Sequence, residues 1–435
     1  MHYKIPKDTP MTKELLAKYI GKHKEDVAKR NNKLQEAYED EYDIFKAPHK
    51  EDGKPDVRVA VNFAKYITDT FTGFFTGSPI KTICEDEKVS QFIERVSAYN
   101  LEDDHNTELA KSCDIHGSTH ELIYFDEDAQ ICYTNVDPRT SFFLVDDSML
   151  ERPMYFIRYY EDAKGVERGS WSDKEYVQYF HHEGEYKWDG EPEAHNFHEV
   201  PAVEYVENKE QMGLFESALS MINAYNKALS EKGNDVDYFA DAYLKVLGPK
   251  IADSDLAVVK RNRIINFEGD GDALPVVDFM AKPSADTTQE NYLDRLEKLI
   301  FLTCMVANIS DDNFAGNASG VSLEYKLLSM ENLAKFKQLK FTAALNRRYK
   351  IIFSTALSIP AGVSADSWVG LQYHFTLNYP ANVSAEAETA KQLEGVVSKE
   401  TQLKVLSIVD DPASEMDRLA EEAQSTREAL DSFEV

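Results

Sequence analysis

Basic residues are scarce in this sequence relative to acidic ones. The 435 residues include 48 Lys and Arg against 77 Asp and Glu, which gives a formal net charge of −29 at pH 7. A protein surface with this balance repels nucleic acids and anionic membranes, because both also carry negative charge. Any contact with DNA therefore has to be local or weak.

Cysteine is also sparse, and its four positions form no pattern. Cys84, Cys113, Cys132 and Cys304 include no CxxC pair. This spacing fits neither a disulfide framework nor a zinc finger, and it indicates ordinary buried thiols in a reducing compartment.

Long apolar runs are missing. The N-terminal stretch MHYKIPKDTPMTKELLAKYI lacks the uninterrupted apolar core of a signal peptide. No segment approaches the ~18 apolar residues that a membrane-spanning helix needs. Because 43% of the residues are hydrophobic, the chain can still form two or three domains with their own cores. We expect an intracellular protein that is soluble in water and has no contact with a membrane.

The motifs of common enzymes are absent as well. GNASG lacks the spacer and the Lys-Ser/Thr pair of a phosphate-binding loop, HEVPA lacks the second histidine of HExxH, and there is no GxSxG. A cluster of four histidines flanks a hairpin-like segment, which favours strand ends or surface positions over a metal site. These histidines are His181, His182, His195 and His198. We expect no catalytic residue, no metal and no cofactor.

The N-terminal half combines helical patterns with a stretch rich in strands. Apolar residues recur at helical spacing over residues 12–42, 62–79 and 88–117. Between residues 120 and 207, short runs such as HELIYF and MYFIRYY alternate with acidic or glycine-bearing turns. This pattern predicts an antiparallel β region attached to helices, and therefore an α+β fold.

The C-terminal half predicts three long helices. The first is expected to extend through residues 211–247, until the GP dipeptide that follows ends it. Asp286 is the expected N-cap of the second helix, and the third covers residues 321–357. The runs AVVKRNRIINFEG and ALPVVDFM predict two short strands between the first two helices.

Shorter elements are predicted around and after the third helix. Residues 371–380 are typical of an isolated strand, and the last fifty residues indicate short helices. Ser398 and Asp411 are the expected N-caps of two of these helices.

Two features of the third helix and of the segment before it stand apart from the rest. The stretch NISDDNFAGNASGVSLEYK joins the second helix to the third, and its glycines and asparagines permit the unusual backbone angles of a mobile loop. Six basic residues crowd the third helix, where they are either solvated or paired with acids, or contact a neighbouring subunit or phosphates. They are Lys335, Lys337, Lys340, Arg347, Arg348 and Lys350.

Five segments resemble the portal proteins, or head-to-tail connectors, of long-tailed bacteriophages that infect Gram-positive bacteria. The segments are NFAKYITDTFTGFFTGSPI, INAYNKALSEKGNDVDYFADAYLKVLG, ISDDNFAGNASGVSLEYKLLSMENLAKFKQLKF, RRYKII and LEGVVSKETQLKVLSIVDDPASEMDRL. The similarity covers nearly the whole chain in the same order, which makes it more specific than any single motif.

The resemblance implies a phage portal fold, assembled as a ring of about twelve copies around a DNA channel. The expected parts are the wing (1–210), two stem helices (211–249 and 286–309), the clip (250–285), the tunnel loop (310–320), a long wing helix with a wing strand (321–384) and the crown (385–435).

The resemblance also implies a function and partners. The ring occupies one capsid vertex of the virion, having assembled in the host cytoplasm, and double-stranded DNA is packaged and ejected through it without sequence specificity. The clip docks the large subunit of the terminase, which hydrolyses ATP, and later the head-completion adaptor. The major capsid and scaffolding proteins are further expected partners.

The tunnel loop is expected to line the narrowest part of the channel. In this role the acidic pair Asp311 and Asp312 repels DNA phosphates, while Phe314, Ala315 and Ala318 offer neutral contact. The full set is Asp311, Asp312, Asn313, Phe314, Ala315, Gly316, Asn317, Ala318, Ser319 and Gly320.

Two alternatives to a portal remain at this point. One is a non-portal oligomeric scaffold inside the cell. A scaffold that is only a monomer or dimer fits the composition but leaves two of the long helices without neighbours to bury their apolar faces. The other is an unrecognised hydrolase, which needs a set of reactive groups that the sequence does not offer.

Overall fold

The computed structural model describes most of the chain. The residues outside the description are 1, 51–53, 241–243, 249–263, 269–275, 280–285, 310–319, 356, 358, 380–382, 407, 410–411, 413 and 423–435. The chain divides into two units: residues 1–307 with 329–377, and residues 308–328 with 378–435. Helices and strands both occur, which confirms an α+β protein.

The expected N-terminal helical region is present and contains one wider turn. The backbone N–H of Leu15 donates to the Thr12 side chain at 3.1 Å, which caps the helix start. The helical elements here are α1 (Lys13–His23), a π-helical turn (Lys24–Ala28), α2 (Lys29–Tyr38) and the short α3 (Asp43–Lys46). The helix α1 packs on a sheet, whereas α2 packs on the helices α4 and α6.

The predicted β region forms two sheets. The larger sheet has the spatial order β1 (Tyr3–Ile5), β5 (Ser141–Asp146), β6 (Pro153–Glu161), β7 (Glu167–Ser172), β8 (Tyr176–Glu183) and β9 (Glu185–Ala194). The smaller has the order β10 (Ala202–Val206), β3 (Ser118–Phe125) and β4 (Ile131–Val136). Neighbouring strands are antiparallel, as expected, except that β1, which was not predicted, lies parallel to β5.

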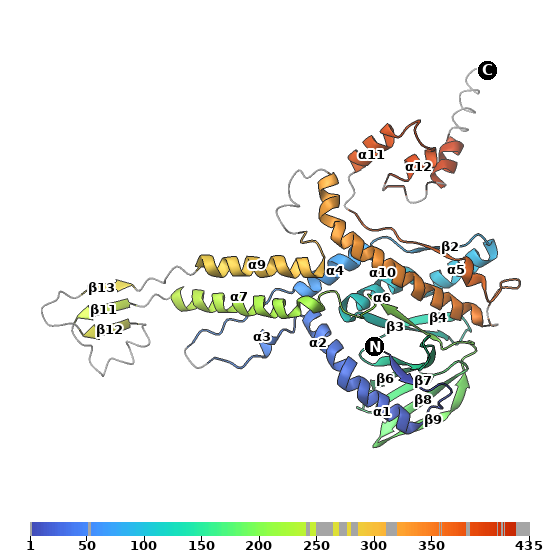
Figure 1. Ribbon diagram of the computed structural model, residues 1–435, viewed down its shortest axis with the longest axis horizontal. Coiled ribbons are helices and arrows are strands. Elements are labelled where there is room, and N and C mark those ends of the chain that lie inside the picture. The colour runs from blue at the N-terminus through green and yellow to red at the C-terminus, as the bar shows by residue number, and fades with distance from the viewer. Residues whose placement is uncertain are drawn as a thin grey trace. The chain divides into compact units, whose positions relative to one another are not determined.

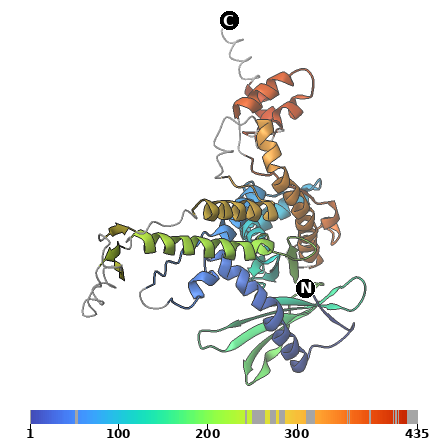
Figure 2. The same cartoon turned by 60° about the vertical axis from the view of Figure 1, so that its left-hand side comes forward.

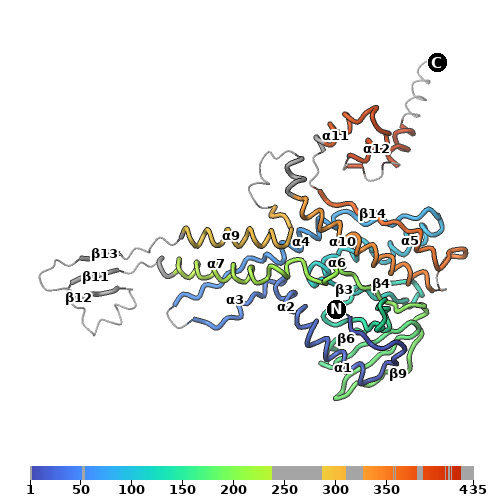
Figure 3. The backbone as a smooth tube through the Cα atoms, viewed as in Figure 1, coloured from blue at the N-terminus to red at the C-terminus, as the bar shows by residue number. Residues whose placement is uncertain are grey.

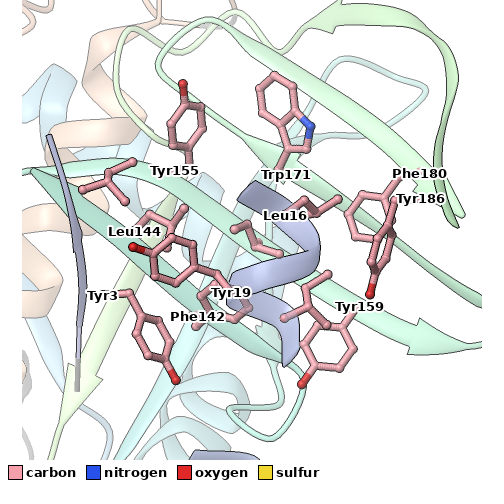
Figure 4. Packing of buried hydrophobic residues seen from close by; sticks show 13 residues of the cluster. Tyr3, Leu16, Tyr19, Phe142, Leu144, Tyr155, Tyr159, Trp171, Phe180 and Tyr186 are labelled. Carbon is pink, nitrogen blue, oxygen red and sulfur yellow. The ribbon is translucent and has the colours of Figure 1, made fainter. Parts of the chain in front are cut away.

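Strand β5 is buried on both faces and connects two cores. Phe142 and Leu144 pack with the α1 residues Leu16, Tyr19 and Ile20 (Figure 4). The alternate residues of β5 point to the opposite face and pack with Ala202 of the smaller sheet. The uninterrupted apolar run FFLV in the sequence is consistent with burial of both faces of this strand.

Three helices follow the predicted positions closely. They are α4 (Phe63–Thr76), α5 (Glu87–Asn100) and α6 (Glu102–His116). The helix α6 ends at Gly117, whose φ of +82° lies in the left-handed region that glycine adopts without strain. A Cβ atom at this position would lie 2.2 Å from the backbone oxygen of Gln211, so only glycine lets the two segments approach so closely.

The long helices α7 (Leu219–Ala240) and α9 (Asp286–Cys304) lie side by side (Figures 1 and 2). The 3-10 turn η2 (Glu216–Ala218) precedes α7. The expectation that the first helix extends to residue 247 was wrong. It ends at Ala240, and β11 (Leu244–Gly248) follows. Apolar residues in the run YLKVLG fit a buried strand as well as a helix, so spacing alone could not separate the two.

Strand β11 is the centre of a three-stranded sheet. It pairs in parallel with β12 (Ile264–Glu268) and antiparallel with β13 (Val276–Phe279). Both outer strands were predicted, whereas the central one was assigned to the helix. The three-stranded sheet therefore includes residues 244–248, which were expected to belong to the first stem helix.

The third long helix, α10 (Gly320–Ser354), is confirmed to within three residues of its expected end. After it come the 3-10 turn η4 (Ser367–Gly370) and β14 (Gln372–His374). The expectation that this strand is isolated was wrong, because β14 pairs antiparallel with β2 (Lys81–Ile83). At three residues, β2 is too short to give a periodic signal.

The unit that contains the C-terminal helices is small. Its helices include α11 (Val383–Gln392) and α12 (Lys399–Leu403). The side chain of Ser398 accepts a hydrogen bond from the Thr401 backbone N–H at 3.3 Å, which confirms the expected N-cap. Asp411, the other expected cap, lies outside the described residues. No helix in the described part of the chain is both long enough and apolar enough to cross a membrane.

Candidate functional site

The expected tunnel loop falls almost wholly outside the described residues, since Asp311–Ser319 are not part of the description and Gly320 is the first residue of α10. The loop residues in question are Asp311, Asp312, Asn313, Phe314, Ala315, Gly316, Asn317, Ala318 and Ser319. The helices on either side of this segment, α9 and α10, are described, and each is held by contacts with the rest of its subunit.

The helix before the segment, α9, is anchored near its C-terminal end by aromatic contacts. The ring centroid of Phe301 lies 5.8 Å from that of Phe63 and 5.7 Å from that of Tyr66, both on α4. Phe63 in turn contacts Tyr225 of α7 at 4.9 Å. Edge-to-face aromatic pairs at these distances are favourable beyond their buried area. The end of α9 is thus fixed to two other helices.

The helix α7 is itself tied to an extended segment by a ladder of polar side chains. The backbone N–H groups of residues 57, 59 and 61 donate to Asn234 (2.6 Å), Ser230 (3.1 Å) and Asn226 (2.8 Å) of α7. Ser230 also donates to the backbone oxygen of residue 59 at 2.9 Å. This segment runs along α7 in Figure 3. We call residues 57–61 the strap.

The spacing of the ladder follows from elementary geometry. Four residues of an α-helix rise about 6 Å, and two residues of an extended chain advance about 6.6 Å. Polar residues at every fourth position of α7 can therefore meet every second N–H of the strap. Gly233 leaves room for this approach, since a Cβ atom there would lie 2.8 Å from Val57 Cγ1.

The helix after the loop segment, α10, is held by two buried ionic clusters. In the first, which we call the lysine cluster, the Lys337 Nζ lies 2.5 Å from Asp114 Oδ1 and 2.8 Å from Glu207 Oε2. It also donates to the backbone oxygen of Ala110, while Thr72 donates to the second oxygen of Asp114 at 2.7 Å. The side chains of Lys337 and Asp114 have no solvent exposure, and that of Glu207 is 1% exposed.

The second, which we call the arginine cluster, lies along the same helix. Arg348 NH1 is 2.7 Å from Glu102 Oε1, and its NH2 is 2.6 Å from Glu121 Oε1 and 2.8 Å from Asn106 Oδ1. His105 Nε2 lies 2.7 Å from the same carboxylate oxygen, Glu121 Oε1. The guanidinium group also stacks over the Tyr133 ring at 4.6 Å. This buried cation therefore has carboxylate, amide and aromatic partners.

The two clusters shift the pKa values of their carboxyl groups in opposite directions. Burial on its own raises the pKa of Glu121, but Arg348 and His105 outweigh burial and lower the pKa to about 2. Burial raises the pKa of Asp114 to about 8, with Lys337 opposing the rise and Glu207 adding to it. The contrast arises because Glu121 faces both Arg348 and His105, whereas Asp114 faces Lys337 together with the negative charge of Glu207.

These contacts revise the expectation for the six basic residues. Lys337 and Arg348 are fully buried and paired with acids. For these two residues, the predicted contact with phosphates or with another subunit was therefore wrong. Arg347 and Lys350 share Glu199, with distances of 2.9 Å and 2.8 Å. Lys335 is exposed and pairs with Glu331, and Lys340 is half-buried. For these four, a subunit or phosphate contact stays a prediction.

The acidic partners and the polar ladder on α7 were not identified from the sequence. A signal existed for the two cations, because Lys337 and Arg348 fall on the apolar stripe of α10. The buried residues of this stripe are Met330, Ala334, Lys337, Phe341, Leu345, Arg348 and Ile352. A charge at such a position has to be paired, but the sequence does not name its partner.

Two of the four clustered histidines have separate hydrogen-bond partners. His181 Nδ1 lies 2.5 Å from Asp189 Oδ1, and His195 Nε2 lies 3.0 Å from the backbone oxygen of Asp173. Among the described residues, no three His, Cys, Asp or Glu side chains are grouped so that they could hold a metal ion.

Comparison with known proteins gives the class to which this arrangement belongs. Residues 17–429 match the profile of a family described as phage portal protein, SPP1 Gp6-like. The chain therefore belongs to this family of phage portal proteins, which confirms the resemblance seen in the sequence. A relative is the portal protein of Bacillus phage SPP1, which is 22% identical over 409 residues, or 88% of this chain and 79% of that protein.

Membership of the family defines the general function. A portal protein provides the channel through which phage DNA enters and leaves the capsid, and it connects the head to the tail at one vertex of the virion. Portal proteins in general act as oligomeric rings together with capsid and terminase proteins, and they are structural proteins rather than enzymes.

Proposed function

We propose that this chain assembles into a closed ring of about twelve copies, in which α7 and α9 form the stem and residues 310–320 line the narrowest part of the DNA channel. The observation that carries the proposal is the separate anchoring of the two helices on either side of those residues. Phe301 fixes the end of α9. Lys337 and Arg348 fix α10.

This anchoring matters because the contacts that hold α9 and α10 do not depend on the segment between them. A loop that contacts moving DNA needs such independence, since the duplex presents a changing surface as it passes. The acidic residues Asp311 and Asp312 then prevent tight binding by repelling phosphates, and Phe314 provides contact that does not depend on sequence.

The remaining parts are assigned by the same proposal. Residues 1–210 and 321–384 form the wing, residues 244–285 form the clip, and residues 385–435 form the crown. The sheet of β11, β12 and β13 supports the assignment of the clip as a compact β element. In this proposal the clip docks the large terminase subunit during packaging, which takes place in the host cytoplasm, and afterwards the head-completion adaptor. The major capsid and scaffolding proteins contact the assembled ring.

The proposal assigns no chemical reaction to this chain, and ATP is hydrolysed by the terminase. Buried carboxylates are candidates for catalytic groups, but Asp114 and Glu121 are instead paired with the buried cations Lys337 and Arg348. Glu121 has both oxygens within hydrogen-bond distance of Arg348, His105 or Tyr205. Pairing of this kind holds a carboxylate in its charged form and accounts for its burial.

Native mass spectrometry of the purified chain at moderate salt, checked by negative-stain images, tests the proposal. We expect closed rings of about a dozen subunits with a central hole. A monomer at every salt and protein concentration would overturn the ring. ATP hydrolysis by the isolated chain that tracks with its rings would overturn the assignment as a non-catalytic conduit.

A further inference from the structure

The helix α10 has an unusual distribution of side chains over its two faces. The buried face carries two cations, Lys337 and Arg348, each with no solvent exposure. The opposite face exposes two large apolar side chains, Phe336 at 68% and Leu339 at 69%. A surface helix ordinarily keeps its charges outside and its large apolar residues inside, so the two buried cations and the two exposed apolar residues depart from this pattern.

The exposed residues form a continuous strip. Asn332, Phe336, Leu339 and Ala343 are all exposed and follow one another at spacings of four, three and four residues. Residues at these intervals lie on one side of an α-helix. We call these four residues the outer face of α10. Large apolar side chains at such exposure, side by side on a rigid helix, are typical of a surface that is covered in the functional assembly.

We infer that the outer face of α10 is a contact surface for a neighbouring copy of this chain, an inference that rests on the proposed ring. The ring supplies the occupant, because each subunit in it has a neighbour on both sides. The contact is heterologous: this face of one copy meets a different surface of the next copy, as rotational symmetry requires in a closed ring of more than two subunits.

The charge around the outer face favours the same occupant. Lys335 lies next to Phe336 with 59% of its side chain exposed, and Lys340, next to Leu339, is half-buried. A chain with a net charge of −29 repels its own copies over most of its surface. The apolar residues of the outer face, with Lys340 and the Glu331-paired Lys335 beside them, therefore fit an apolar surface with acidic borders, and the chain's own acidic surface provides those borders.

The buried clusters explain why this surface stays available. To turn the outer face inward, α10 would have to rotate and remove Lys337 and Arg348 from their carboxylates. Leaving buried charges without partners is strongly unfavourable. The ionic clusters therefore fix the orientation of the helix, and Phe336 and Leu339 remain outside in the free subunit.

Substitutions on the outer face, with a matched control, test the inference. The variants Leu339→Ser and Phe336→Ser are compared with the control Leu150→Ser. Leu150 is 68% exposed, like Phe336, but lies on a turn outside α10. We expect the ring fraction in native mass spectrometry to fall at least about tenfold for the first two variants at equal protein concentration, and to stay at the wild-type level for the control. Circular dichroism and thermal unfolding establish that all three variants are folded.

A photo-crosslinking amino acid at position 336 identifies what covers the strip. A cross-link between two copies in wild-type-like rings supports the inference. A cross-link within one chain to residues 378–422, or rings that form without any cross-link at this position, would overturn it. If wild-type protein forms rings and Leu339→Ser forms them equally well, this inference fails while the proposed ring stands. If wild-type protein forms no ring, both fail.

Discussion

Lys337 and Arg348 lie eleven residues apart on α10, which is about three helical turns, and both side chains are completely buried against carboxylates. Because each cation has its own acidic partners, the helix is fixed at two points along one face. A shift of α10 by one turn would separate both cations from their partners at once. The helix that follows residues 310–319 is thus held in a single register.

Removing the cation from the arginine cluster should destabilise the protein strongly. In Arg348→Met, Glu102 and Glu121 remain buried without their counter-ion, and the expected loss is about 3–5 kcal/mol of unfolding free energy. Denaturant unfolding followed by circular dichroism measures the loss. The control is Arg347→Met, whose ion pair with Glu199 is partly exposed, with an expected loss of at most about 1 kcal/mol. Equal losses in the two variants would contradict the role of burial.

The lysine cluster predicts a dependence of stability on pH. The pKa of Asp114 rises from its ordinary value of 3.8 to about 8 on folding, so the folded protein binds more protons between these pH values. This group therefore stabilises the protein most at low pH, and its contribution is lost as pH rises toward 8, by up to about 1.4 kcal/mol per pH unit.

The variant Asp114→Asn separates this contribution from that of other groups. Thermal unfolding between pH 6 and pH 8 should show a smaller loss of stability with rising pH in the variant than in the wild type. Glu108→Gln on the same helix, where the side chain is 53% exposed, removes a charge without changing a buried site and should keep the wild-type slope. Parallel pH profiles for wild type and Asp114→Asn would show that Asp114 does not hold the proton.

The long helices and the β region could be predicted because their signals are local. Period and composition predicted α10 and the strands between residues 118 and 206, and Ser398 was recognisable as a cap. The boundary between α7 and β11 was missed because the pairing of β11 with β12 and β13 decides it. Strand pairing is a tertiary effect that apolar spacing does not contain.

The site was harder to predict for a related reason. Lys337 lies 223 residues from Asp114 in sequence, and Arg348 lies 227 residues from Glu121. In a chain with 77 acidic residues, nothing local distinguishes the few carboxylates that become buried partners. The ladder of Asn226, Ser230 and Asn234 does have a regular spacing of four, but its partner is a strap of backbone N–H groups, which any sequence provides.

Disrupting this ladder should release the strap locally. In Ser230→Ala the middle contact to residue 59 is lost in both directions, since Ser230 both accepts from and donates to that backbone. Hydrogen exchange at the amides of residues 57–61 should become roughly 5- to 30-fold faster, in line with about 1–2 kcal/mol for the lost hydrogen bonds. Lys227→Ala, at an exposed position of α7, serves as the control and should leave exchange unchanged. Protection that survives in Ser230→Ala would show that other contacts hold the strap.

The last prediction concerns the tunnel-loop segment itself. Deleting residues 313–317 should leave ring formation and thermal unfolding unchanged, because α9 and α10 are anchored by contacts outside the segment, through Phe301, Lys337 and Arg348. The yield of DNA-filled capsids in a complementation assay should fall sharply, since a channel without its inner loop no longer controls the passing duplex. A variant with the same five residues replaced by alternating glycine and serine keeps the length of the loop and removes Phe314 and Asn313. Failure of both variants would assign the function to these side chains, failure of the deletion alone would assign it to the length of the loop, and normal yields from both would contradict a role of this segment at the channel constriction.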